Sequence, residues 1–151
     1  MNTIDGNLLD QTRGILCHQV NCKGVMGAGI AKAIRDKYPK VFTDYRHAYA
    51  QGQLQLGNTV FSVINSELVV ANLCGQYDYG RSKYKVYTRY DAVEEALVKV
   101  AQYQLLTTAS GIALPVYIPR GMGCTLAGGE WDKMEALIEA ILPKAIIVRY
   151  K

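Results

Sequence analysis

The chain has 151 residues, of which 50% are hydrophobic, and a formal net charge of +4. This length fits one domain spanning residues 1–151. No apolar run reaches the length of a membrane span, which is about 18 residues. The mild positive charge favours an anionic ligand without requiring nucleic acid. The four cysteines form no Cys-x-x-Cys pair and have apolar or glycine neighbours, so we expect buried thiols in a cytoplasmic protein rather than a disulfide or a zinc site.

Stretches typical of strands and helices alternate along the chain. Strands are expected at residues 1–4, 15–20, 56–64, 68–73, 112–117 and 145–150, and helices at residues 30–38, 40–50, 89–110 and 131–142. Asn65 and Ser66 make a tight turn, so the third and fourth strands are predicted to form a hairpin. Thr88 is expected to cap the long helix. Its inward-facing residues are predicted to be Val93, Leu97, Val100, Ala101 and Leu105. The alternation predicts an α/β protein whose mixed sheet is covered on both faces.

A first glycine loop, residues 21–29, joins a buried strand to a helix and contains Gly24, Gly27 and Gly29. Such a junction directs backbone N–H groups and the positive end of the helix at a ligand, and phosphate is the usual one. Glycines also permit left-handed conformations and close approach of the backbone to a ligand. The spacing matches neither the dinucleotide-binding fingerprint nor a P-loop, and a tight turn without a ligand is the alternative.

A second glycine loop, residues 119–131, again joins a strand to a helix. Both glycine loops follow the carboxyl ends of strands, where open α/β sheets bind their ligands. Two such loops in one domain predict a ligand with two phosphates. No motif predicts a metal or a bound cofactor.

A tyrosine loop, residues 75–88, interleaves four tyrosines with Arg81, Lys83 and Lys85. One interpretation is a nucleic-acid surface, in which aromatic rings stack on bases and cations bind phosphates. The alternative, which we favour because the stretch is short, is a solvated surface loop.

The two loops together give the chain a resemblance to macro domains. It resembles the branch that includes terminal ADP-ribose protein glycohydrolase, the yeast ADP-ribose 1″-phosphate phosphatase, and phage and bacterial relatives. The matching residues are 6–9, 18–31, 38–39 and 119–131. The resemblance implies a three-layer α/β/α sandwich with a mixed central sheet. It also implies ADP-ribose or an ADP-ribosylated substrate as the partner, with no membrane involved.

Site residues follow from the resemblance. Asn7 falls at the adenine end, where many family members have an acidic residue, and residues 73–76 would form the floor near the distal ribose. The implied ligand-binding residues are Asn7, Leu8, Val20, Asn21, Gly27, Ala28, Gly29, Ile30, Ala31, Cys74, Gln76, Arg120, Gly121, Met122, Gly123, Cys124, Thr125, Leu126 and Ala127. Residues 121–127 would wrap the diphosphate, and their backbone N–H groups suit pyrophosphate oxygens.

The chain also departs from these relatives. The glycohydrolase has a catalytic lysine where this chain has Gly75 or Gln76, and an aspartate where it has Ala127. His18 matches a histidine implicated in catalysis by the yeast phosphatase, and imidazole can act as an acid or base near neutral pH. The alternative for His18 is a core residue bonded to one partner.

Three function classes therefore stay open. The first is a hydrolase that removes phosphate from ADP-ribose 1″-phosphate or cleaves an ADP-ribosyl linkage, with His18 as its catalytic residue. The second is a module that binds ADP-ribose without chemistry. The third, and least favoured, is a nucleic-acid-binding protein.

Overall fold

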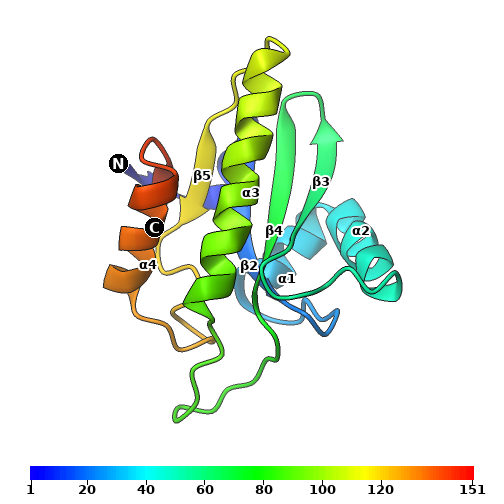
Figure 1. The fold of residues 1–151 in the computed structure, drawn as a ribbon, viewed down its shortest axis with the longest axis vertical. Helices are drawn as coiled ribbons and strands as arrows, with labels where there is room; N and C mark the ends of the chain where they lie inside the picture. Colours follow the sequence, from blue (N-terminus) through cyan, green and yellow to red (C-terminus); the bar gives the residue numbers. More distant parts are fainter.

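The computed structural model describes residues 1–151, which form a six-stranded sheet with helices on both faces (Figure 1). The strands are β1 (Asn2–Gly6), β2 (Gly14–Asn21), β3 (Thr59–Asn65), β4 (Leu68–Gln76), β5 (Val116–Pro119) and β6 (Ile146–Tyr150). The helices are the short 3-10 helix η1 (Leu8–Asp10), α1 (Gly29–Lys37), α2 (Pro39–Ala50), α3 (Tyr90–Ala109) and α4 (Trp131–Ile141). None of the helices is both long and apolar enough to span a bilayer.

The sheet is mixed, as the sequence predicts. Its strand order is β1-β6-β5-β2-β4-β3, and only the β3–β4 hairpin is antiparallel. The chain leaves β2 to build β3 and β4 on one side, then crosses through α3 to place β5 on the other side of β2. This reversal makes the carboxyl end of β2 the switch point of the sheet, where ligands bind in such folds.

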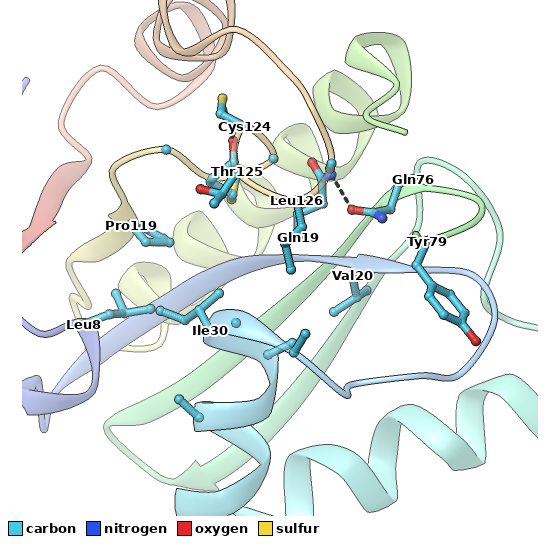
Figure 2. Close-up of a pocket in the computed structure, with 18 of the residues that line it drawn as sticks. Leu8, Gln19, Val20, Ile30, Gln76, Tyr79, Pro119, Cys124, Thr125 and Leu126 are labelled. Carbon is cyan, nitrogen blue, oxygen red and sulfur yellow. Dashed lines mark hydrogen bonds between the residues drawn. The ribbon is translucent and has the colours of Figure 1, made fainter. Parts of the chain in front are cut away.

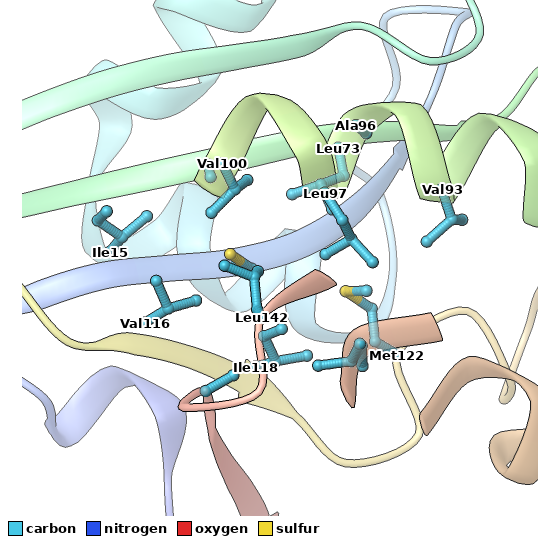
Figure 3. Close-up of a cluster of buried hydrophobic side chains, with 14 of the residues drawn as sticks. Ile15, Leu73, Val93, Ala96, Leu97, Val100, Val116, Ile118, Met122 and Leu142 are labelled. Carbon is cyan, nitrogen blue, oxygen red and sulfur yellow. The ribbon is translucent and has the colours of Figure 1, made fainter. Parts of the chain in front are cut away.

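The hydrophobic core has two halves, one on each face of the sheet. The face covered by α3 and α4 holds a cluster of 18 buried residues, part of which Figure 3 shows. The face covered by α1 and α2 holds a cluster of 15. Strand β2 contributes to both in alternation, with Ile15 and Cys17 on the α3 side and Leu16 and Val20 on the α1 side. The predicted three layers are confirmed.

Two predictions about α3 are wrong. The N-cap position is Arg89 rather than Thr88, whose hydroxyl instead donates to the backbone oxygen of Gly123 at 2.6 Å. Leu105 is 70% exposed rather than inward-facing, because the last turns of α3 extend beyond the strands (Figure 1). The other predicted inward residues do pack toward the sheet: Val93, Leu97 and Val100 are in the buried cluster, and Ala101 packs against it.

Candidate functional site

A pocket of about 800 Å³ opens where the parallel strands end (Figure 2). Its wall includes the last residue of each of these strands: Gly6 of β1, Asn21 of β2, Gln76 of β4, Pro119 of β5 and Tyr150 of β6. The carboxyl ends of parallel strands meet at one edge, so the topology alone brings these distant residues together.

The first glycine loop is folded around the side-chain amide of Asn21. Its Oδ1 accepts from the backbone N–H of Lys23 at 2.9 Å, and its Nδ2 donates to the oxygen of Val25 at 2.8 Å. The buried hydroxyl of Tyr45, on α2, donates to the backbone oxygen of Asn21 at 2.5 Å. Asn21 therefore holds the turn, and its hydrogen-bonding capacity is largely used within the protein.

The first glycine loop leads directly into the N-terminus of α1 at the pocket. The N-cap residue Ala28 makes no side-chain hydrogen bond to the helix. The first backbone N–H groups of any helix lack intrahelical acceptors, and here they lie on the pocket wall beside Gly27. This end of α1 can therefore bind an anionic group.

The second glycine loop is held both by its own turn hydrogen bonds, such as that from the N–H of Cys124 to the oxygen of Gly121 at 2.8 Å, and by side chains beneath it. Gly123 has a φ of +76°, and a Cβ there would lie 2.7 Å from Oε1 of Gln19 and 3.1 Å from Oγ1 of Thr88. Gln19 donates through Nε2 to Thr88 at 2.9 Å and to Oε1 of Gln76 at 2.8 Å. This network requires glycine at position 123 and links the loop to the ends of β2 and β4.

The two glycine loops face each other across the pocket. A Cδ atom of Leu126, in the second loop, lies 3.9 Å from the position that a Cβ of Gly29 would occupy. Leu126 is 43% exposed, so it forms a rim rather than part of the core. A ligand in the pocket would therefore contact both loops at once.

Most of the predicted binding residues line this pocket. All of them except Cys74 are on its wall, from Asn7 through the residues of both loops. Cys74 is fully buried and packs in the cluster beneath α1 and α2. Gln76, two residues further at the strand end, does reach the wall.

His18 is not on the pocket wall. It is completely buried, and its Nε2 lies 2.5 Å from Oδ1 of Asn72, its register partner on β4. Asn72 donates its own Nδ2 to the oxygen of Val60, which fixes the amide so that Nε2 of His18 must be the protonated nitrogen. Burial lowers the pKa of His18 to about 4. The structure thus fits the core alternative for His18, three residues before the strand end.

Ten wall residues were not identified from the sequence. They are Gly6, Gln19, Val25, Ala33, Tyr79, Gly80, Arg81, Pro119, Val148 and Tyr150. Gly6 and Pro119 flank predicted site residues, and their positions just beyond the ends of predicted strands could have identified them as wall residues. Gln19 and Arg81 gave no signal, because their positions depend on contacts between segments that are distant in the sequence.

The charge of the pocket wall suits an anion. Arg81 and Arg120 are its cations, and the wall has no aspartate, glutamate, histidine or lysine. Burial raises the pKa of Cys124, so its thiol stays protonated. No group of three or more histidine, cysteine, aspartate or glutamate side chains is positioned to hold a metal ion. The site can bind and orient a ligand, and it has no side chain suited to act as a general base near neutral pH.

Comparisons with known proteins agree with this architecture. The family model described as Macro domain matches residues 17–69. The DNA ADP-ribosyl glycohydrolase of Mycobacterium tuberculosis is 42% identical over 52 residues, which are 34% of this chain and 15% of that protein. The ADP-ribose 1″-phosphate phosphatase of Aspergillus clavatus is 47% identical over 51 residues, which are 33% of this chain and 25% of that one. The matches thus span a quarter or less of these curated relatives.

Solved structures match nearly the whole chain. A Bacteroides thetaiotaomicron protein of unknown function has a TM-score of 0.86 and 31% identity, over 99% of this chain and 97% of that one. The macrodomain of Thermus aquaticus DarG has a TM-score of 0.79 and 21% identity, over 99% and 97%. Thermosipho africanus DarTG, solved in complex with ADP-ribose, has a TM-score of 0.76 and 19% identity, over 99% and 42%. The family model described as Macro domain thus matches part of the chain, and nearly the whole chain shares the fold of these macrodomains.

Proposed function

We propose that the chain binds ADP-ribose in the pocket at the carboxyl edge of the sheet. The observation that carries this proposal is the pair of glycine loops that face each other across one pocket. The start of α1 offers backbone N–H groups from one side, and the second loop, with Gly121 and Gly123 in left-handed conformations, lies opposite. A diphosphate bridging the two loops would place one sugar toward each end of the pocket.

The two ends of the pocket differ in a way that suits the two halves of ADP-ribose. Asn7 and Tyr150 lie at one end, and the Oδ1 of Asn7 already accepts the N–H of Leu9 at 2.9 Å. The Nδ2 of Asn7 stays available to an adenine ring nitrogen. Asn21 and Gln76 lie at the other end, which is the proposed position of the distal ribose.

The names of the relatives support the same ligand. The curated relatives from Mycobacterium tuberculosis and Aspergillus clavatus are named for reactions on ADP-ribosyl DNA and on ADP-ribose 1″-phosphate. The Thermosipho africanus structure contains ADP-ribose. Both named reactions change a bond at the distal ribose, so hydrolysis there is the reaction we propose for this chain.

Gln76 is the residue on which the proposed reaction depends most. Its Oε1 accepts from Gln19 at 2.8 Å (Figure 2), and its Nε2 donates to the oxygen of Asp78 at 2.9 Å. The second proton of this amide stays free to orient a water molecule or a leaving group. The wall offers no general base, so catalysis would rest on positioning, and the same absence favours a binding module without chemistry as the second candidate.

Calorimetry with ADP-ribose and AMP tests the binding. We expect tighter binding of ADP-ribose, because AMP reaches only one phosphate position. Equal affinities would contradict a site in which both loops hold the diphosphate.

Turnover assays on ADP-ribose 1″-phosphate and on ADP-ribosyl nucleobase or ester linkages test the reaction. Gln76→Ala should lower turnover by about 10–100-fold with little change in ADP-ribose affinity. His18→Gln serves as the control, because His18 lies off the pocket wall and should keep parental turnover. Absence of turnover on every substrate, with tight binding retained, would favour the binding module.

A further inference from the structure

A second, smaller cavity opens next to the proposed ADP-ribose pocket. It has a volume of about 300 Å³ and eight lining residues from the tyrosine loop and the second glycine loop. Arg81, Thr125 and Leu126 line both cavities, so the two share one wall. Lys83 and Lys85 line only the smaller one. Its lining has three cations and no acid, which makes it more positive than the main pocket.

Hydrogen bonds between the two loops build this cavity. The backbone N–H of Tyr87 donates to the oxygen of Ala127 at 2.7 Å, and that of Thr88 donates to the same oxygen at 3.3 Å. Gly128 has a φ of +78°, and a Cβ there would lie 3.1 Å from the backbone oxygen of Lys85. The segment that carries the lysines is therefore fastened to the second glycine loop at the base of the cavity.

The three cations have no carboxylate partner. The chain has seven side-chain ion pairs, and Arg81, Lys83 and Lys85 take part in none of them. Nearby cations differ, since Arg89 pairs with Asp91 and Lys133 pairs with Glu130. Three uncompensated charges around one cavity favour an anion, and phosphate accepts hydrogen bonds from both arginine and lysine.

The position of the cavity indicates which phosphate it would bind. Arg81 lies a few residues after Gln76 in the sequence, and both residues line the main pocket, as does Tyr79 between them. The wall that the two cavities share therefore lies at the end proposed for the distal ribose. A group attached to that ribose would leave the main pocket past Leu126. We propose that the smaller cavity is an anion subsite. It binds a phosphate group that is attached to the distal ribose, either directly or as part of a larger substituent. This proposal rests on the proposed function.

The same phosphate chemistry has two sources. One is a phosphate bonded directly to the distal ribose, and the other is a phosphodiester of a nucleic-acid strand. Exposed aromatic rings flank the cations, with Tyr84 90% exposed and Tyr79 50% exposed, and such rings can stack on the bases of a single strand. The experiment therefore needs one probe for each source.

The test uses the double variant Lys83→Gln/Lys85→Gln, which changes only residues outside the main pocket. Lys40→Gln/Lys144→Gln is the matched control, because it removes the same charge from exposed positions away from both cavities. The probes are ADP-ribose, ADP-ribose 1″-phosphate and a short fluorescent single-stranded oligonucleotide. Calorimetry measures the first two, and fluorescence anisotropy over a series of salt concentrations measures the third.

We expect the double variant to bind at least one phosphate-bearing probe about tenfold more weakly than the parent, with ADP-ribose affinity unchanged in both variants. If the oligonucleotide responds, the slope of log affinity against log salt should also decrease by about one per lysine. A selective effect on ADP-ribose 1″-phosphate identifies the ribose phosphate as the source, and a selective effect on the oligonucleotide identifies the strand.

Parental affinity of the double variant for both phosphate-bearing probes would overturn the subsite. An equal loss for all three probes would also overturn it, because the lysines would then act on the main pocket. Failure of the parent to bind ADP-ribose at all would contradict the proposed function, which the ADP-ribose titration reports separately.

Discussion

The two glycine loops have the same place in the fold and are stabilised in different ways. The first loop is held by one amide, that of Asn21, with help from the hydroxyl of Tyr45. The second loop contains Gly123, whose missing side chain makes room for Gln19 and Thr88. The amide of Asn21 thus supports the first loop, and the space left at Gly123 lets Gln19 and Thr88 support the second.

Gly27 of the first loop and Gly123 of the second differ in how well they would tolerate a side chain. A Cβ at Gly27 would meet only a methyl group of Val25 at 3.6 Å, which is ordinary contact, and Gly27 has no positive φ. A Cβ at Gly123 would meet Oε1 of Gln19 at 2.7 Å and a methyl group of Met134 at 3.0 Å. Counting glycines in the sequence does not separate the two cases. Their neighbours in space do.

Gly123→Ala is expected to have the largest effect. The left-handed backbone costs about 1–3 kcal/mol for a residue with a side chain, and overpacking adds about 1–3 kcal/mol. Displacement of Gln19 would also move the second loop, so ADP-ribose binding should be lost or strongly reduced. Thermal unfolding and calorimetry measure the two effects.

Gly27→Ala is the matched control in the first loop. It adds the same methyl group at a position with space, so the melting temperature should stay within about 2 °C of the parent. If the two variants lower stability equally, the contrast between Gly27 and Gly123 is wrong.

The sequence predicted where the two glycine loops lie, but not which side chains hold them in place. Strand-to-helix junctions rich in glycine are local patterns, so the amino-acid order alone places residues 21–29 and 119–131 at a site. It does not reveal the support of the second loop, because Gln19 bonds to a threonine 69 residues away. That contact depends on β4 and α3 bringing Thr88 back to the end of β2.

The interpretation of His18 shows a second limit of sequence reasoning. Strand β2 is buried along nearly its whole length, so its sequence does not indicate which side chains reach the opening. His18 belongs to the half of the core beneath α1 and α2, where Asn72 is its partner. The resemblance to the yeast phosphatase suggested a catalytic role for His18. In the structure this side chain is buried off the pocket wall, three residues along the strand from Asn21, which is about 10 Å.

Because of His18, the stability of the whole fold, and with it of both loops, should decrease at acid pH. The unfolded chain binds a proton at this histidine below pH 6.5, whereas the folded chain, with a pKa of about 4, does not. The part of the folding stability that is linked to His18 is therefore fully present above pH 6.5 and is lost as the pH falls toward 4. The difference corresponds to about 3 kcal/mol, at about 1.4 kcal/mol per pKa unit.

Comparing the parent with His18→Gln isolates this contribution from that of the carboxylates. Glutamine can donate to Asn72 without titrating, so the variant should lose less stability than the parent between pH 6.5 and 4.5. Chemical denaturation at several pH values gives the two curves. Parallel curves would mean that His18 is not the group that titrates.

Tyr45→Phe should have the smallest effect and should act on the first loop alone. The change removes one buried hydroxyl that lies 2.5 Å from the backbone oxygen of Asn21 and 2.9 Å from its Oδ1, and a hydrogen bond of this kind contributes about 1 kcal/mol. The ring keeps its packing on α2, and the amide of Asn21 keeps its bonds to Lys23 and Val25. The loop should therefore keep its shape and open more often, which weakens ADP-ribose binding by a few-fold.

Hydrogen exchange distinguishes this local effect from a general loss of stability. Amides of residues 21–27 should exchange faster in Tyr45→Phe, while those of the second loop should match the parent, since Thr88 and Gln19 do not contact Tyr45 in the hydrogen-bond network. Gly123→Ala should give the reverse pattern. If both variants speed exchange in both loops equally, the loops form one cooperative unit, and their different supports have no separate consequence for binding.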